Sequence, residues 1–302
     1  MLNKIASLLL FISAVCLTQA QETGKQPLRI GLIADIQYAD KDSHGTRFYR
    51  ESLPKLSQGV QVLNEQGVDF SVVMGDLVDE GPKDLPAVLA GLDRLQKPVY
   101  NLLGNHDFAG VPDPDNLYKA LRMPASYYAI DTAGWRFLFL NTNELSAYAT
   151  VPNTKKAKAY EQLAATVKSQ GRTNAQPWNG GVGKQQLTWL QKQLKQAQKR
   201  GLNVLVFTHH PLLPEDNGHE ALNNREILDL LSKYDRVKAV ISGHNHQGAF
   251  DTYRQSLPCI TLEGMIETAD QNSYGILTLS ENKLIITGSG RMTSREVDLN
   301  PQ

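Results

Sequence analysis

The sequence has little of several features that would define a special class of protein. It has two cysteines among 302 residues, Cys16 and Cys259, which excludes a disulfide-rich scaffold. It has no excess of charge, with 31 basic and 31 acidic residues, so we expect no nucleic-acid partner. Beyond residue 20 it has no apolar run as long as a membrane span. These absences indicate an ordinary globular protein.

The first twenty residues differ from the rest of the chain. Lys4 is followed by the apolar stretch IASLLLFISAVCL and by TQA before Gln21. This order predicts a secretory signal peptide over residues 1–20, with an N-terminal anchor helix as the alternative. A lipid attachment at Cys16 is disfavoured because bulky Val15 precedes it. We expect an exported, disulfide-free mature chain with no membrane contact after signal removal, in a bacterial periplasm or secreted.

Short apolar runs alternate with helical patterns over most of the chain. Six runs have the length and β-branched content of buried strands: LRIGLIA, FSVVM, PVYNLL, WRFLFL, LNVLVF and VKAVI. Apolar residues at helical spacing predict helices over 53–63 and 184–199. This alternation predicts an α/β fold with helices outside the sheet. After about residue 250, the runs PCITL, YGILTL and KLIITG predict a second, more antiparallel sheet.

Residues 144–183 interrupt this rhythm. They are polar and end close to the stretch QGRTNAQPWNGG. A long segment without a regular pattern inside a compact domain is usually functional or disordered. We therefore expect residues 21–302 to form one domain, in which 144–183 is an inserted lid or, alternatively, an unstructured surface loop.

Polar side chains follow five of the predicted strands. In chain order they are Asp35 and Gln37, Asp76 and Asp79, Asn105 with His106 and Asp107, His209 and His210, and His244 and His246. Each cluster alone fits a turn or a helix cap. Ligands of open α/β sheets bind at the carboxyl ends of strands, so the same placement after five strands predicts a common site at one sheet edge.

The side-chain types indicate a metal centre. Carboxylate, amide and imidazole groups without thiolate suit Mn²⁺, Fe or Zn²⁺. There are more candidate ligands than one ion needs, whereas two ions that share a bridging carboxylate would use them. Two such ions can clamp the attacking and leaving oxygens of a displacement at phosphorus, which predicts a phosphohydrolase.

The motifs D-x-Q, G-D-x-x-D, G-N-H-D, H-x-P and G-H-x-H occur in this order between Asp35 and His246. They resemble those of the calcineurin-like metallophosphoesterase superfamily. The resemblance implies an α/β fold with a four-layer αββα sandwich of two β-sheets flanked by helices. It also implies two metal sites, one held by Asp35, Gln37, Asp76 and His246, and the other by Asp76, Asn105, His209 and His244. His210 is the alternative to His209.

The same resemblance implies roles for three residues beside the metals. His106 would be a catalytic group that stabilises charge and protonates the leaving oxygen. Asp107 and Asp79 would orient His106 and the nearby ligands.

Three stretches resemble a subgroup, the manganese-dependent ADP-ribose/CDP-alcohol diphosphatases: GLIADIQYAD, GTRFYRESL and LEGMIETADQNSYG. In the first stretch Gln37 stands where most relatives carry His. The resemblance implies two divalent ions, with Mn²⁺ favoured over Fe or Zn²⁺. It implies that metal-activated hydroxide cleaves the phosphoanhydride bond of a small nucleotide-type substrate. The alternatives are a broader phosphomonoesterase or phosphodiesterase of the same superfamily, and a non-catalytic scaffold.

Several residues are candidates for substrate contacts. Arg47 and Arg50 suit phosphate, with solvated helix-start arginines as the alternative. Tyr49 or Tyr38 could stack on a base, and a core role is the alternative for each. Trp178 in the polar segment is a further candidate for stacking.

The sequence does not assign a contact to four further polar residues. Glu263 and Glu267, in the stretch LEGMIET, are expected near a pocket wall. His44 and His219 lie in turn-like stretches and are interpreted as surface residues or neighbours of a substrate channel.

Overall fold

The protein is described by a computed structural model that covers residues 26–299, so the signal peptide predicted over 1–20 lies outside the described residues. The helices are α1 (Ser52–Glu65), α2 (Leu85–Leu92), α3 (Pro114–Ala120), α4 (Lys155–Ser169), α5 (Lys184–Arg200) and α6 (Asn224–Leu231), with a 3₁₀ turn η1 at His106–Phe108. The strands are β1 (Leu28–Ile33), β2 (Phe70–Val73), β3 (Val99–Asn101), β4 (Tyr128–Thr132), β5 (Trp135–Phe139), β6 (Asn203–Thr208), β7 (Val237–Ser242), β8 (Gln247–Tyr253), β9 (Leu257–Glu263), β10 (Ser273–Leu279), β11 (Lys283–Gly290) and β12 (Arg295–Asp298). Each of the nine predicted apolar runs overlaps a strand.

These strands form two six-stranded mixed sheets. The first has the order β12-β11-β10-β1-β2-β3, in which β1, β2 and β3 run parallel and β10 pairs antiparallel with β1. The second has the order β4-β5-β6-β7-β9-β8, in which β5, β6, β7 and β9 run parallel. Strand ends that carry functional side chains therefore come from both sheets.

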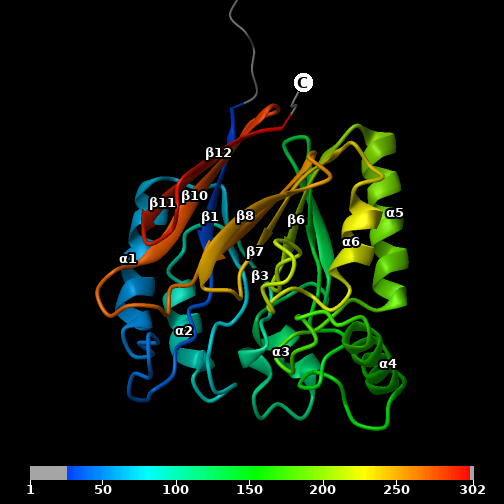
Figure 1. Cartoon of the computed structure of the whole chain (residues 1–302). Coiled ribbons are helices and arrows are strands. Elements are labelled where there is room, and N and C mark those ends of the chain that lie inside the picture. Colours follow the sequence, from blue (N-terminus) through cyan, green and yellow to red (C-terminus); the bar gives the residue numbers. More distant parts are fainter. Residues whose placement is uncertain (1–25, 300–302) are drawn as a thin grey trace, which may run out of the picture.

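The two sheets pack face to face and helices cover their outer faces (Figure 1). Between the sheets the core is apolar; Phe70 of β2 meets Phe137 of β5 edge-on, with ring centroids 5.2 Å apart. Leu56 and Val60 of α1 pack with α2 against the first sheet, whereas Leu190 of α5 packs with α6 against the second. Burial of these apolar faces on both sides of each sheet drives the layering. This arrangement confirms the predicted four-layer αββα sandwich.

Two expectations about the sheets were wrong. The C-terminal strands do not form a sheet of their own, because β9 and β8 extend the second sheet and β10–β12 extend the first. The polar clusters do not meet at the edge of one sheet but where the corresponding ends of two sheets lie together. Apolar runs identify strands but carry no information about which distant strand each one pairs with.

The segment 144–183 is not an unstructured loop, because it contains the fifteen-residue helix α4. Thr154 caps this helix by accepting a hydrogen bond from the Ala157 backbone N–H. Ala157 and Val167 of α4 are buried, and Tyr160 and Leu163 at helical spacing between them are half-buried, so the helix packs with one weakly apolar face. Among the described residues, no helix is long and apolar enough to cross a membrane.

Candidate metal centre

The polar clusters come together where β1, β2, β3, β6 and β7 end. Asp35 and Gln37 follow β1, Asp76 follows β2, Asn105 follows β3, His209 follows β6, and His244 and His246 follow β7. All of these side chains except Asn105 are buried. Parallel strands bring their carboxyl ends to one side of a sheet, so residues far apart in the sequence converge at one place.

The backbone of this region is strained. Five predicted ligands have a left-handed φ although none is glycine: Asp35 (50°), Gln37 (43°), Asp76 (50°), His244 (71°) and His246 (32°). Such conformations cost about 1–3 kcal/mol each and persist where the surrounding structure enforces them. Their concentration at the strand ends indicates a functional site.

Glycine at position 104 lets two of the loops approach closely. A Cβ at Gly104 would lie 2.1 Å from Oδ1 of Asp76, which is closer than any real contact. The same Asp76 oxygen accepts a hydrogen bond of 2.9 Å from the backbone N–H of His106. The loops after β2 and β3 can therefore meet only if residue 104 has no side chain.

A first group of ligand-type atoms surrounds Asp35. Carboxylate oxygens of Asp35 and Asp76 and an imidazole nitrogen of His246 lie within 4.8 Å of one another. The Nε2 of Gln37 lies 3.3 Å from Oδ2 of Asp76, whereas its Oε1 is buried with no hydrogen-bond partner among residues 26–299. A buried amide oxygen without a partner costs free energy that a cation would recover, so these residues fit a hard divalent ion.

A second group lies on the other side of Asp76. Nε2 of His209 is 3.3 Å from Oδ1 of Asn105 and 3.5 Å from Oδ2 of Asp76. The rings of His209 and His244 have centroids 4.9 Å apart. Asp76 therefore contacts residues of both groups.

His209 and His210 differ in which ring nitrogens are available. Nδ1 of His209 lies 2.9 Å from the Met74 carbonyl oxygen, so Nε2 faces the site. His210 has both nitrogens engaged, Nδ1 with the Thr142 hydroxyl at 2.8 Å and Nε2 with the Trp178 carbonyl oxygen at 3.2 Å. An imidazole needs one free lone pair to bind a metal. His210 lies near His209 and His244 but is occupied by protein partners.

His106 and Asp79 form a pair beside these groups. Nδ1 of His106 lies 2.9 Å from Oδ1 of Asp79, and Lys41 also contacts the Asp79 carboxylate. The Asp107 carboxylate accepts hydrogen bonds from the backbone N–H groups of Leu77, Val78 and Gly104. The structure thus places Asp79 against the His106 ring and Asp107 beneath the loops that carry the ligands.

Burial and neighbouring charges shift the pKa values of the site. Burial opposes the charged form of His209, but the Asp76 carboxylate outweighs it and raises the pKa of His209 to about 9. Burial favours protonated Asp76, but His209 and His106 outweigh it and hold the pKa of Asp76 below its usual range. Burial and the adjacent His209 lower the pKa of His210 to about 3, so this imidazole is neutral.

The candidate substrate residues lie in different environments. Nη1 of Arg47 lies 3.9 Å from Oδ1 of Asp79, near His106. Arg50 points away, since its guanidinium pairs with Asp40 at 2.7 Å and Asp42 at 2.6 Å on the surface.

The aromatic candidates also differ. Tyr49 is only 4% exposed and packs with Ala39 and Ile266, which corresponds to its core alternative. Trp178 is 43% exposed. His44 is exposed, whereas the ring of His219 lies 5.5 Å from that of His244, beside the site.

Two residues contact the proposed ligands although the sequence assigned no contact to them. Asn179, in the polar segment, has its Oδ1 3.1 Å from Nε2 of His244. Glu267 has its Oε1 2.9 Å from Nδ1 of His246. The stretch LEGMIET singled out Glu267 without giving it a partner, and no sequence pattern marked Asn179.

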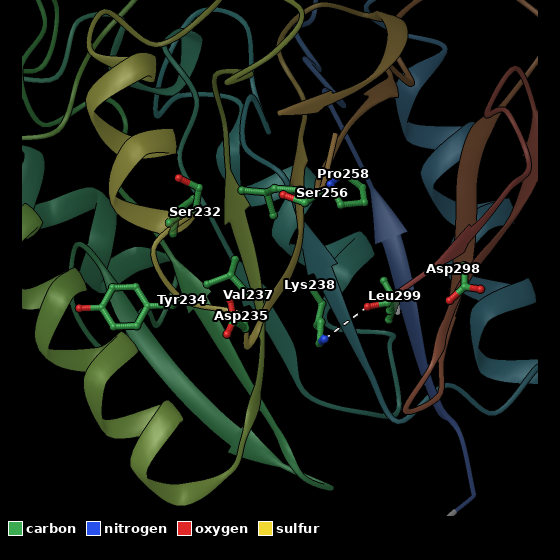
Figure 2. A pocket seen from close by; sticks show the side chains of 11 residues that line it. Ser232, Tyr234, Asp235, Val237, Lys238, Ser256, Pro258, Asp298 and Leu299 are labelled. Carbon is green, nitrogen blue, oxygen red and sulfur yellow. Dashed lines mark hydrogen bonds between the residues drawn. The ribbon is translucent and has the colours of Figure 1, made fainter. Parts of the chain in front are cut away.

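A surface cavity of about 320 Å³ lies away from these groups (Figure 2). It is lined by residues at the starts of β7 and β9, including Val237 and Pro258, and Nζ of Lys238 donates to the Leu299 carbonyl oxygen at 3.3 Å. Since the ligands follow the other end of β7, the length of the six-residue strand, roughly 20 Å, separates this cavity from the metal centre.

Comparison with known proteins gives one consistent result. Residues 28–248 match the family described as calcineurin-like phosphoesterase. An Arabidopsis thaliana protein named manganese-dependent ADP-ribose/CDP-alcohol diphosphatase is 30% identical, covering 91% of this chain and 98% of its own. The Homo sapiens protein of the same name is 26% identical, and the match covers 91% of this chain and 93% of that protein.

Solved structures show the same fold. A dimetal phosphatase from Danio rerio superposes with a TM-score of 0.82 at 25% identity, covering 91% of this chain and 100% of that one. GAP50, described as the anchor in the inner membrane complex of Plasmodium, superposes with a TM-score of 0.60 at 17% identity. The superposition covers 92% of this chain and 90% of that one. The second likeness concerns the fold alone.

Proposed function

The chain belongs to the calcineurin-like phosphoesterase family, and we propose that it hydrolyses the phosphoanhydride bond of nucleoside diphosphate compounds of the ADP-ribose or CDP-alcohol type. The observation that carries this proposal is the extent of the similarity to the curated diphosphatases, which spans 98% of the Arabidopsis thaliana protein. The buried Gln37, with an amide oxygen that has no protein partner, adds support from the site itself.

The enzyme is a metal-dependent phosphohydrolase, and its ligand set fits two divalent cations with Mn²⁺ favoured. We assign one cation to Asp35, Gln37, Asp76 and His246, and the other to Asp76, Asn105, His209 and His244. When bound, such cations supply an activated water and Lewis-acid stabilisation of charge at phosphorus. An amide oxygen is a neutral, hard ligand, which favours Mn²⁺ over Zn²⁺ at the Gln37 site.

His106 acts on the leaving group in this proposal. Its Nδ1 faces Asp79 at 2.9 Å, which leaves Nε2 as the nitrogen that can meet substrate. Asp79 holds the proton on Nδ1 and fixes the ring, so that His106 can hydrogen-bond to the departing phosphate oxygen or protonate it. Arg47, 3.9 Å from the same carboxylate, is the arginine placed to contact a substrate phosphate.

The polar segment 144–183 is proposed to cover the nucleoside part of the substrate. Two contacts support its place beside the site: Asn179 meets His244, and the Trp178 carbonyl oxygen meets His210. The Trp178 side chain is 43% exposed, so its ring is available for stacking on a base.

A comparison of substrates tests the proposed function. With Mn²⁺ present, we expect ADP-ribose and CDP-choline to be hydrolysed with a kcat/KM well above that of a generic aryl phosphate. A preference for the aryl phosphate would contradict the proposal and favour the broader phosphomonoesterase or phosphodiesterase. No hydrolysis of any of the three, by a protein that takes up no transition metal, would favour a scaffold.

We also propose that the protein is exported, with a bacterial periplasm as the simplest compartment. Lys4, the apolar stretch after it and the small residues before Gln21 support this proposal. N-terminal sequencing of the protein from fractionated cells should give a chain that starts near Gln21. Recovery of the intact N-terminus from the cytosol would contradict it.

A further inference from the structure

Glu267 contacts a metal ligand although it lies outside the five motifs between Asp35 and His246 that supply the ligands. Its Oε1 lies 2.9 Å from Nδ1 of His246, and Nε2 of the same ring lies 3.9 Å from Oδ1 of Asp35. We propose that Glu267 is a positioning residue that directs Nε2 of His246 at the cation between Asp35 and Asp76, and that it thereby sets the Mn²⁺ affinity of this site. The inference rests on the two-cation centre of the proposed function.

The geometry allows only one arrangement of the imidazole. A carboxylate accepts hydrogen bonds and does not donate when ionised, so Nδ1 must carry the proton that faces Glu267. Nε2 then keeps its lone pair for a metal. Both side chains are buried, so water does not compete for this hydrogen bond.

Glu267 is itself held firmly. The ammonium of Lys55, on α1, donates to the backbone carbonyl oxygens of Met265, Glu267 and Thr268. The loop before α1 adds two backbone hydrogen bonds, from Phe48 N–H to the Ile266 oxygen at 3.0 Å and from Thr268 N–H to the Thr46 oxygen at 3.2 Å. A carboxylate on a fixed backbone can orient a ligand, whereas one on a loose loop cannot.

The charge of Glu267 distinguishes the proposed cation site of His246 from the neighbouring one of His209 and His244. Nδ1 of His209 faces the Met74 carbonyl oxygen and Nε2 of His244 faces the Asn179 amide oxygen, both neutral acceptors. His246 alone among the three has a carboxylate on the ring nitrogen opposite the one proposed to bind a cation, and it shares its cation with the neutral Gln37. A carboxylate behind an imidazole makes it a more basic ligand. Glu267 therefore offsets the weak ligand at position 37.

Binding of Mn²⁺ by variants of the otherwise intact protein tests the inference without reference to activity. Glu267→Gln keeps the volume and an acceptor oxygen but removes the charge, and Glu267→Ala removes both. The control is Glu263→Gln, which removes an equally buried carboxylate whose side-chain partners are Thr293 and Arg295 rather than a proposed ligand. Free Mn²⁺ is followed by electron paramagnetic resonance during a titration, and circular dichroism establishes that each variant is folded.

We expect the parent protein to bind two Mn²⁺ per chain. Glu267→Gln should weaken one of the two sites about 10-fold and Glu267→Ala about 10- to 100-fold, with the other site unchanged. Glu263→Gln should have the same two Mn²⁺ dissociation constants as the parent protein. A folded Glu267→Gln variant with both Mn²⁺ dissociation constants unchanged would overturn this inference but not the proposed function. Equal weakening of Mn²⁺ binding by Glu263→Gln would do the same. A parent protein that binds no Mn²⁺ would overturn the proposed function together with it.

Discussion

His209 and His210 are adjacent in the chain, and their rings meet at 81° with centroids 5.0 Å apart, yet only His209 has a nitrogen available to the metal centre. Nε2 of His209 faces Asn105 and Asp76, whereas both nitrogens of His210 face protein partners. These contacts favour His209 over His210 as the ligand among the two candidates that the H-x-P motif left open.

Substitution of the two histidines should have different consequences. His209→Ala should lose one bound cation and reduce kcat by more than about 100-fold, because it removes a ligand rather than an outer partner. His210→Gln should keep both cations but lower the free energy of unfolding by about 1–3 kcal/mol, because the Thr142 hydroxyl and the Trp178 carbonyl oxygen lose their buried partner. Elemental analysis and urea unfolding measure the two effects. Loss of metal in His210→Gln with retention in His209→Ala would reverse the assignment.

Gln37→His should change which metal the enzyme prefers. Imidazole binds Zn²⁺ better than an amide oxygen does, so the ratio of activities with Zn²⁺ and Mn²⁺ should rise while the fold is kept. The buried Oε1 of Gln37, with no protein partner, is the structural basis of this expectation. Activity measured after reconstitution with each metal is the test. An unchanged ratio would mean that Gln37 does not bind a metal.

Gly104→Ala should damage the metal centre. Its Cβ would lie 2.1 Å from Oδ1 of Asp76, so the loops after β2 and β3 must separate and the bridging carboxylate must move. Misplacement by about 1 Å can cost roughly 100-fold in rate, which is the loss of kcat expected here.

Gly59→Ala serves as the matched control. This glycine lies within α1, where an added Cβ would meet only ordinary contacts at 3.4 Å, and alanine favours a helix by about 0.5–1 kcal/mol. We expect parental activity and equal or higher stability. Parental activity in Gly104→Ala would show that the close approach of the two loops is not needed.

Lys55 should make stability depend on pH in the alkaline range. Burial lowers the pKa of Lys55 to about 8, below its value of 10.5 in an unfolded chain. Between these values the unfolded chain binds more protons than the folded one, so this residue's contribution to the free energy of unfolding rises with pH, by at most about 1.4 kcal/mol per unit. Lys55→Met should lack this rise. The free energy of unfolding is measured against pH for both proteins. Parallel curves for parent and variant from pH 8 to 10.5 would contradict the expectation.

The strand ends of the site could be predicted from the sequence because buried parallel strands are continuous apolar runs, and the residue after each run is easy to locate. LRIGLIA before Asp35 and VKAVI before His244 are examples. The helix α4 does carry a helical signal in the spacing of Ala157, Tyr160, Leu163 and Val167, but this weak stripe lies in a segment that is polar overall. Strand β8 has no fully buried residue, so it lacked an apolar signal.

The outer partners of the ligands could not be predicted for a different reason. Glu267 meets His246 because the loop after β9 lies beside the loop after β7. Asn179 meets His244 because the polar segment returns to the same loop after β7. These are side-chain contacts between distant segments, and they depend on strand pairing that local patterns do not encode. The pairing of Asp79 with His106 followed from the family resemblance.

The central claim is that Asp76 bridges two cations that carry out phosphoanhydride hydrolysis, and the variant Asp76→Asn tests it most directly. The measurement is the rate of Mn²⁺-dependent ADP-ribose hydrolysis by parent and variant, with bound Mn²⁺ counted in the same samples. The account predicts that the parent binds two Mn²⁺ per chain and hydrolyses ADP-ribose. It predicts that the variant, with one carboxylate charge removed from both sites, binds fewer cations and loses more than about 100-fold in kcat. Full activity and two bound Mn²⁺ in Asp76→Asn would contradict it.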